Sequence, residues 1–269
     1  MAEGSTDGKG GSESSKSQAR GRAGCARSAL LGAGAVLIVV YVFIRTGDGN
    51  GDNGAEQRRA TVTTEPRVTT TLASRDVAAV EPECPEEDGS SERTLKFTEA
   101  PPVCIDPEAT YVATVATNRG DFEITLDQAS APLAVNSFVF LARYHFYDGV
   151  GFHRVLEDFL AQTGDPFDPD VGDADAGYLL PEEPPTVAPF YPKGAVAMSN
   201  LTDANTTGSE FFVITGDGAV DVQPTYSRIG EVTSGQTVLD AINATAVPND
   251  NIGVPTELTV IESITIDEN

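Results

Sequence analysis

The sequence predicts a mainly-β domain over its last 160 residues, roughly, built as a closed antiparallel barrel or as a sandwich. Short segments alternate between apolar and polar residues, turn-forming residues separate them, and only two stretches carry helical spacing. The first two segments, residues 111–117 and 122–126, flank a turn at 118–121, so we expect a hairpin there.

The remaining elements follow the same patterns. We expect six further strands, at residues 151–155, 159–163, 195–199, 211–214, 227–232 and 258–266. The first helix should open at Pro132, because proline suits the first helical turn, and it should end before Tyr147. Apolar residues at helical spacing predict the second helix over residues 236–243.

The chain is strongly acidic, with 41 Asp and Glu residues against 17 Lys and Arg residues and a formal net charge of -24. This balance argues against nucleic acid as a partner, because phosphates would be repelled and no basic stripe is present. Residues 1–27 differ, since they are rich in Gly, Ser and basic residues. Their composition predicts a disordered segment.

An uncharged apolar run occupies residues 28–44, between Arg27 and Arg45. As a helix it would span about 26 Å, at the short end for crossing a membrane. Because positive charge precedes it, we expect a single-pass anchor in the cell membrane, with the N-terminus cytoplasmic and the following domain extracytoplasmic. A cleaved signal peptide and a buried core helix are the alternatives, although no A-x-A-like cleavage site follows Ile44.

The anchor divides the chain into five parts. These are the cytoplasmic N-terminus at 1–27, the anchor at 28–44, a flexible extracytoplasmic linker at 45–83, a Pro-rich lead-in at 84–108 and the folded domain at 109–269. Cys84 and Cys104 lie in the lead-in, whereas Cys25 lies on the cytoplasmic side. Exported cysteine pairs are usually oxidised, so we expect a Cys84–Cys104 disulfide, with two free thiols as the alternative.

Residues 151–165 carry the most informative pattern, GFHRVLEDFLAQTGD. A cation, an amide, aromatic and aliphatic residues on two short alternating segments suit a groove that holds an apolar ring and donates hydrogen bonds to a peptide backbone. The pattern resembles the cyclophilin signature F-H-R-V-[IL]-x-x-F-M-x-Q-x-G-D. A second stretch, GAVAMSN at 194–200 and NTTGSEFFVI at 205–214, is similar to the cyclophilin segment G-x-[LV]-[SA]-M-[AS]-N followed by N-T-N-G-S-Q-F-F.

The resemblance covers residues 111 to 269 and implies a closed eight-stranded antiparallel barrel capped by two helices. It also implies peptidyl-prolyl cis-trans isomerase activity on proline-containing polypeptides, with no cofactor and no metal. Rotating an X-Pro amide changes no covalent bond, so catalysis requires binding the twisted amide better than either planar form. Arg154 is the residue expected to do this, because its charge is permanent and its donor fork is rigid. A surface salt bridge is the alternative role for this arginine.

The resemblance assigns the rest of the site as well. Phe159 and Gln162 join Arg154 as catalytic residues, with the Gln162 amide donating to a substrate carbonyl. The expected substrate-binding residues are Leu160, Ser199, Asn200, Phe212, Val222 and Tyr226, of which Ser199 and Asn200 offer backbone groups. On composition alone, the aromatic residues would be ordinary core packing and the glutamine a solvated strand residue. Their positions in the motifs favour the site.

Several positions depart from the family pattern. Leu160 replaces Met, Glu210 replaces Gln, Asp221 takes the position of a Trp, Val222 that of a Leu and Tyr226 that of a pocket His. Because the chain contains no Trp, we expect weak cyclosporin binding. His153, next to Arg154 on a predicted strand, should face the opposite side and have a structural role.

The loop at residues 165–175 is acidic, with carboxylates at Asp165, Asp168, Asp170, Asp173 and Asp175. Clustered carboxylates can bind calcium, but this spacing fits no EF-hand loop. We therefore expect a solvated acidic loop and no metal site.

Together these observations predict a bacterial, membrane-anchored isomerase that assists the folding of exported or envelope proteins, in which X-Pro isomerisation is slow. Two other functions stay open. The groove could hold proline segments as a binding module or chaperone with weak or no isomerase activity, or the barrel could be a structural envelope protein. The joint presence of Arg154, Phe159, Gln162 and Phe212 disfavours the structural role, which needs none of them together.

Overall fold

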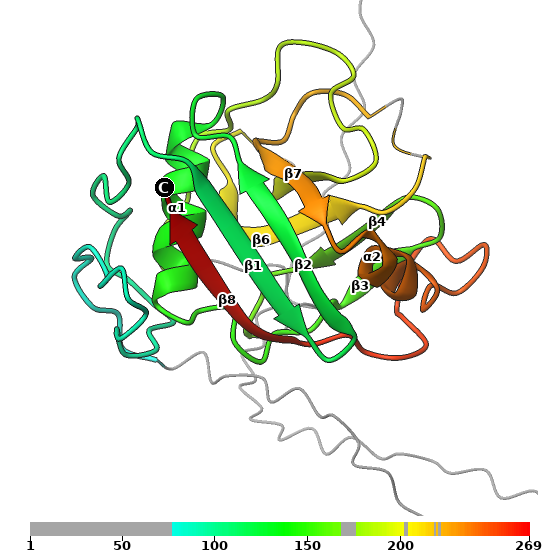
Figure 1. Ribbon diagram of the computed structural model, residues 1–269, viewed down its shortest axis with the longest axis horizontal. Coiled ribbons are helices and arrows are strands. Elements are labelled where there is room, and N and C mark those ends of the chain that lie inside the picture. The colour runs from blue at the N-terminus through cyan, green and yellow to red at the C-terminus, as the bar shows by residue number, and fades with distance from the viewer. Residues whose placement is uncertain (1–76, 168–175, 202–203, 218, 220–221) are drawn as a thin grey trace, which may run out of the picture. The chain divides into compact units, whose positions relative to one another are not determined.

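The computed structural model describes residues 77–167, 176–201, 204–217, 219 and 222–269. In this part of the chain, eight strands form one sheet and two helices pack against it (Figure 1). The strands are β1 (Tyr111–Thr117), β2 (Gly120–Leu126), β3 (Arg154–Leu156), β4 (Leu160–Thr163), β5 (Ala195–Asn200), β6 (Thr207–Ile214), β7 (Arg228–Ser234) and β8 (Ile261–Glu268). The helices are α1 (Pro132–Arg143) and α2 (Gln236–Asn243).

The sheet is antiparallel throughout, in the order β3-β4-β6-β5-β7-β2-β1-β8. It curls into a half-barrel, and the segments just before its edge strands, β3 and β8, meet at a bridge between Gly151 and Val260. There the Phe152 N–H donates to the Thr259 carbonyl at 2.8 Å. The predicted mainly-β class with eight antiparallel strands and two helices is confirmed. In place of a fully closed barrel or a sandwich, the structure has one curled sheet whose edge strands share no ladder.

One face of the sheet and helix α1 form the main core. Helix α1 is buried over nearly its whole length, and Phe138 at its centre is fully buried. No side chain of Ala131 caps its first turn. Instead the Glu183 carboxylate, from a distant loop, accepts hydrogen bonds from the backbone N–H groups of Leu133 at 3.2 Å and Ala134 at 2.9 Å. A negative charge at this helix end also suits the helix dipole.

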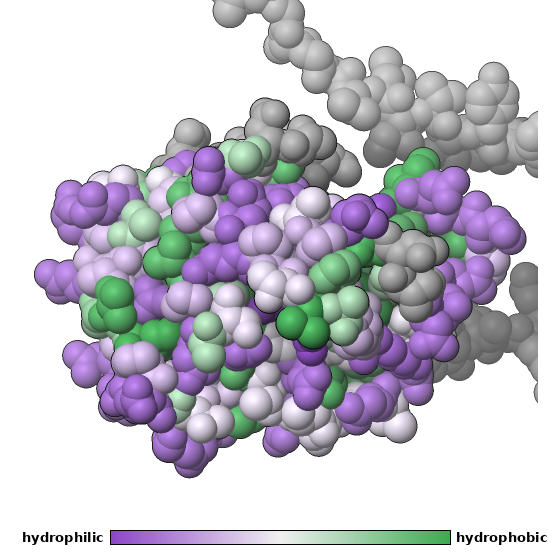
Figure 2. All heavy atoms as spheres, turned by 90° about the horizontal axis from the view of Figure 1, so that it is seen from above, coloured by the Kyte–Doolittle hydropathy of each residue, from purple (hydrophilic) through white to green (hydrophobic). Residues whose placement is uncertain are grey.

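The two helices cover different parts of the sheet. Helix α1 packs against β8 and β6, whereas α2 packs against β2, β3 and β4. In Figure 1, α1 lies at the left of the sheet and α2 at its right, and buried residues of both helices belong to the main core. The face in Figure 2 is mostly hydrophilic, and its hydrophobic residues form small separate patches, as expected for a solvated surface.

Strand bounds differ from the prediction where the chain leaves regular alternation. Strand β1 and helix α2 have the predicted bounds. Strand β6 begins at Thr207 rather than at residue 211, because Asn200 of β5 pairs with Thr207 beyond a bulge. Strand β3 is shortened to Arg154–Leu156, because the segment before it bridges to the segment before β8 instead.

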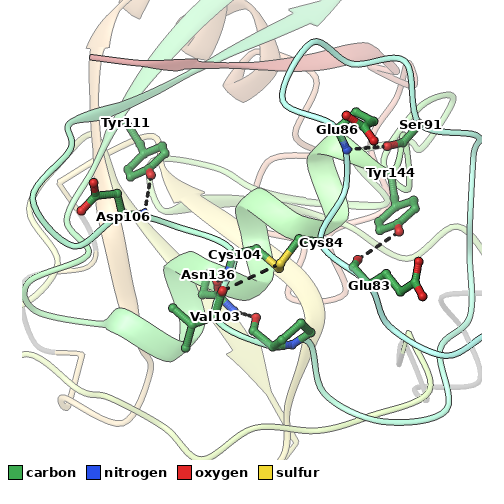
Figure 3. The surroundings of a disulfide bond; sticks show 11 residues. Glu83, Cys84, Glu86, Ser91, Val103, Cys104, Asp106, Tyr111, Asn136 and Tyr144 are labelled. Atoms are coloured by element: carbon green, nitrogen blue, oxygen red, sulfur yellow. Dashed lines mark hydrogen bonds between the residues drawn. A yellow bond between two sulfur atoms is a disulfide. The ribbon is translucent and has the colours of Figure 1, made fainter.

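The lead-in, residues 84–108, is fastened to α1. Cys84 and Cys104 form the predicted disulfide, with their Cα atoms 5.3 Å apart (Figure 3). Beside it, the Asn136 side chain from α1 reaches the lead-in with both ends of its amide. Its Oδ1 accepts from the Cys104 N–H at 2.8 Å, and its Nδ2 donates to the Pro102 carbonyl at 2.9 Å. One helical side chain therefore satisfies two backbone groups of the lead-in.

The Phe97 side chain packs in the main core and so attaches the lead-in to it. Its side chain is 1% exposed, and its ring lies 4.6 Å from the Phe140 ring and 5.2 Å from the Tyr144 ring. Its backbone N–H donates to the Ala176 carbonyl at 2.6 Å. At Gly177 the φ angle is +101°, and a Cβ would lie 1.9 Å from the Phe97 carbonyl oxygen, so only glycine fits there. The lead-in thus completes the core that covers α1.

Replacing both Cys84 and Cys104 with serine should lower the free energy of unfolding by about 3 kcal/mol, because the loop of 20 residues no longer restricts the unfolded chain. Urea unfolding followed by circular dichroism measures this loss. Cys25→Ser is the matched control and should leave the unfolding curve unchanged. Superimposable curves for the double variant and the wild type would contradict the prediction.

The predicted membrane anchor at 28–44 lies outside the described residues, as do residues 1–27 and 45–76. Among the residues that the structure does describe, no helix has both the length and the apolar character needed to span a membrane. The anchor stays a prediction from the sequence.

Candidate active site

A row of paired residues crosses the face of the sheet that is turned away from the main core. Arg154 of β3 pairs with Gln162 of β4, Gln162 with Phe212 of β6, and Phe212 with Ala197 of β5. Neighbours on the same strands, such as Ala161, belong to the main core. Directly paired residues project from one face, so the strand register alone brings together a cation, an amide and an aromatic ring.

Hydrogen bonds link the polar members of this row to Glu210. Arg154 Nη1 donates to Gln162 Oε1 at 3.2 Å. Gln162 Nε2 donates to Glu210 Oε2 at 2.6 Å and more weakly to Ser199 Oγ at 3.4 Å. Glu210 stands two residues before Phe212 on β6, so it shares the same face of the sheet. We call Arg154, Gln162, Ser199 and Glu210 the polar chain.

An apolar cluster adjoins the polar chain. Leu160 and Phe212 are buried in it, at 7% and 4% exposure. Phe159, Val222 and Tyr226 are partly buried and pack against the same cluster. The rings of Phe212 and Tyr226 meet edge to face with their centroids 5.2 Å apart. The structure therefore brings all five apolar residues of the predicted site together.

Tyr191 belongs to this cluster, although the sequence analysis missed it. Its side chain is 2% exposed, and its ring centroid lies 6.4 Å from that of Phe212 and 6.1 Å from that of Tyr226. The Tyr191 hydroxyl donates to the Tyr226 carbonyl at 2.8 Å and accepts from the Tyr226 N–H at 2.9 Å. Tyr191 thereby fixes the backbone of Tyr226. It lies in a Pro-rich stretch without periodicity, so no pattern marked it.

The last two residues of β5 have different surroundings. Ser199 meets the polar chain through its side-chain oxygen. The Asn200 amide donates to the Thr225 carbonyl at 2.9 Å and so holds the loop that carries Tyr226. The substrate contacts expected of the Ser199 and Asn200 backbones stay a prediction.

The Glu210 carboxyl group has an unusual electrostatic environment. Its side chain is 17% exposed, and burial raises its pKa to about 7. The hydrogen bond from Gln162 lowers this pKa, the negative charge of Asp165 raises it, and the positive charge of Arg154 lowers it. Glu210 therefore changes its charge near neutral pH, unlike an ordinary glutamate.

The prediction that His153 faces away from the site is wrong. Strand β3 begins only at Arg154, so the strict alternation of an extended strand does not apply to His153. The His153 Nε2 atom lies 3.5 Å from Glu210 Oε1. The imidazole is thus a neighbour of the polar chain.

The acidic loop is described only in part. Residues 168–175, with four of its five aspartates, lie outside the described residues, as does Asp221. Asp165 is 3% exposed, and its Oδ1 accepts from the Phe167 N–H at 2.7 Å, so the expected solvation of this residue is wrong. Over the described ranges, no three His, Cys, Asp or Glu side chains are grouped to hold a metal ion.

Glu210→Gln should stabilise the protein at alkaline pH. The pKa of Glu210 is about 7 in the folded chain against 4.5 ordinarily, so the folded chain holds this proton more tightly than the unfolded chain. Stability is lost as the pH rises between these two values, and the variant escapes that loss. Urea unfolding should find the variant about 3 kcal/mol more stable than the wild type at pH 8.5 and equal to it at pH 4. A difference independent of pH would contradict this prediction.

Comparison with known proteins adds independent findings. Residues 112–266 match the family described as cyclophilin type peptidyl-prolyl cis-trans isomerase/CLD. Over 177 residues, the chain is 37% identical to peptidyl-prolyl cis-trans isomerase A of Mycobacterium tuberculosis, an alignment that covers 60% of this chain and 94% of that protein.

Two solved structures of a cyclophilin type peptidyl-prolyl cis-trans isomerase from Cryptosporidium parvum share the fold, one of them in the presence of the dipeptide Ala-Pro. Both are 24% identical to this chain, with TM-scores of 0.53 and 0.52. They cover 60% and 59% of this chain and 99% of their own.

The curled antiparallel sheet with two helices is thus the cyclophilin architecture. The chain belongs to the cyclophilin-type peptidyl-prolyl cis-trans isomerases, and proline-containing peptides are its substrate class. The family expected from the two sequence motifs is confirmed.

Proposed function

We propose that this isomerase speeds the folding of exported or envelope proteins, and that Arg154 acts by binding the twisted X-Pro amide. The observation that carries the proposal is the hydrogen bond of 3.2 Å between Arg154 and Gln162 beside an apolar cluster. A positioned cationic donor next to a pocket for an apolar ring is the arrangement that a proline-directed site needs.

The uncatalysed rotation is slow because the amide must lose its partial double-bond character, at a barrier of about 20 kcal/mol. In the twisted state the proline nitrogen becomes pyramidal and basic. The Arg154 guanidinium can then donate a hydrogen bond that the planar amide cannot accept. Because this interaction exists only in the transition state, it lowers the barrier without tightening ground-state binding. No covalent intermediate takes part.

The remaining residues would hold the substrate. The proline ring would occupy the apolar cluster formed by Phe159, Leu160, Phe212, Val222 and Tyr226. The Gln162 amide would donate to a substrate carbonyl, and the backbones of Ser199 and Asn200 would bind the residues before the proline. Tyr226 and the lack of any Trp favour weak cyclosporin binding.

The same proposal places the domain outside the cell membrane, held by an uncleaved helix at residues 28–44. The positive charge before this apolar run supports a cytoplasmic N-terminus. The Cys84–Cys104 disulfide supports an oxidising compartment for the domain. A tether there would keep the isomerase close to chains that emerge from the export machinery.

Exchange NMR on a short X-Pro peptide tests the activity. Without enzyme, cis-trans exchange takes tens of seconds or more. Catalytic amounts of the full chain should accelerate it strongly. Binding of the peptide without faster exchange would contradict the proposal and favour the proline-binding module. If the chain neither binds the peptide nor accelerates its exchange, both proposed functions fail and only the fold assignment remains.

A separate experiment tests the location. Protease added to intact cells should remove a C-terminal tag and spare an N-terminal tag. A chain that lacks residues 1–76 should support the folding of exported clients less well than the full chain. Equal support by the two chains would count against the tether.

A further inference from the structure

We propose that Glu210 is a positioning residue of the isomerase site, which holds the Gln162 amide firmly against Arg154 in its ionised state and more loosely when protonated. The inference rests on the proposed role of Arg154. The cyclophilin segment N-T-N-G-S-Q-F-F, which residues 205–212 resemble, has Gln where this chain has Glu210.

The geometry of the Gln162 amide carries the argument. Its oxygen accepts from Arg154 Nη1 at 3.2 Å, and its nitrogen donates to Glu210 Oε2 at 2.6 Å. An ionised carboxylate can only accept hydrogen bonds, and a guanidinium can only donate them. With Glu210 ionised, the amide has therefore one orientation that satisfies both neighbours.

Protonation of Glu210 weakens this restriction. Arg154 can only donate, so the Gln162 oxygen stays toward it in both states. A neutral carboxyl group still accepts from the Gln162 nitrogen, but the charge-assisted hydrogen bond at 2.6 Å becomes a neutral one of about half the strength. Gln162 is then held less firmly, and so is the Arg154 guanidinium that it contacts at 3.2 Å.

Three charged or titratable groups act on Glu210 from the elements around it. His153, which precedes β3, lies 3.5 Å from Glu210 Oε1. Arg154 of β3 lowers the pKa of Glu210, and Asp165, which follows β4, raises it. Burial, the largest influence, brings the pKa to about 7, so the change of state falls in the physiological range. His153 is the other titratable side chain beside Glu210, so it is the group from which Glu210 must be distinguished.

The expected signature is a pH dependence of kcat with little change in KM. Arg154 acts on the twisted amide, which affects kcat, whereas the apolar cluster that binds the proline ring does not titrate. As the pH rises through about 7, Glu210 ionises, Gln162 becomes fixed, and kcat should increase severalfold. An ordinary glutamine at this position would give no such step.

The test measures kcat and KM of the full chain by exchange NMR from pH 5.5 to pH 8.5. We expect the wild type to show a step with a midpoint near 7 and Glu210→Gln to show a flat profile with measurable activity throughout. His153→Asn should keep a step, because Glu210 remains. Glu123→Gln, which removes an exposed carboxylate on β2, is the matched control and should keep the wild-type profile.

A second readout does not depend on activity. The carboxyl carbon of Glu210 and the side-chain amide of Gln162, followed by NMR in the full chain, should titrate together with one midpoint. Glu210→Gln should abolish the titration of the Gln162 signal. If the rate step persists in Glu210→Gln, or if the Gln162 signal is insensitive to pH, the proposal is overturned. Should Arg154→Ala retain full activity, the role of Arg154 fails, and the Gln162 titration alone still decides whether Glu210 orients the amide.

Discussion

Replacing Arg154 with alanine should lower kcat/KM for an X-Pro peptide by a factor of about 100 to 1000, with most of the loss in kcat. The side chain is a permanent donor held by Gln162 at 3.2 Å beside the apolar cluster, and alanine removes the donor without filling the site. Binding of the proline ring depends on other residues, so KM should change little. Exchange NMR over a range of peptide concentrations separates the two constants.

Two further variants show what the loss of activity in Arg154→Ala means. Arg154→Lys keeps the charge but not the planar fork, so it should recover only part of kcat. Arg119→Ala is the matched control, because Arg119 pairs with Glu257 at 2.9 Å near the β1–β2 turn. It should leave both constants near their wild-type values. A loss in Arg154→Ala confined to KM would mean that Arg154 only binds the ground state.

Phe97→Ala should destabilise the folded protein by about 3 to 5 kcal/mol, the range for removing a fully buried phenylalanine. The ring is 1% exposed and packs at an angle against the rings of Phe140 and Tyr144, so alanine would leave a cavity in the core. Urea unfolding monitored by circular dichroism gives the loss directly. It should exceed the loss caused by removing the disulfide.

Val103→Ala is the matched control for Phe97→Ala. Val103 also lies in the lead-in, but it is 77% exposed, so its truncation should change the free energy of unfolding by less than about 0.5 kcal/mol. Equal, small effects at Phe97 and Val103 would show that the lead-in contributes nothing to the stability of the core.

The sequence predicted the regular parts of the fold well, because periodicity reports burial. The alternation at residues 111–117 and the helical spacing at 236–243 gave the bounds of β1 and α2. The start of β6 could not be predicted in this way, since Thr207, Gly208 and Ser209 show no apolar alternation and owe their extended form to pairing with β5. The burial of Phe97 could not be predicted from periodicity either, because Phe97 is a single aromatic residue in a polar, Pro-rich segment.

The site was predictable to the extent that it lies within two short motifs. Those motifs located Arg154, Gln162 and Phe212, which the strand register places in one row. Two contacts depend on chain segments far apart in sequence and could not be foreseen: the packing of Tyr191 against Tyr226, and the carboxylate of Glu210 between Gln162 and His153. Electrostatics of this kind depend on burial, which a local pattern does not report.

The packing of the lead-in has a practical consequence for recombinant expression. The family match begins at residue 112, and a fragment designed to start there would lack Phe97 and both lead-in cysteines. Its α1 surface would then expose the rings of Phe140 and Tyr144 to solvent, together with the unsatisfied amide of Asn136. Such an uncovered aromatic surface promotes aggregation. A fragment that begins at residue 77 keeps this surface covered and is the better choice for crystallisation.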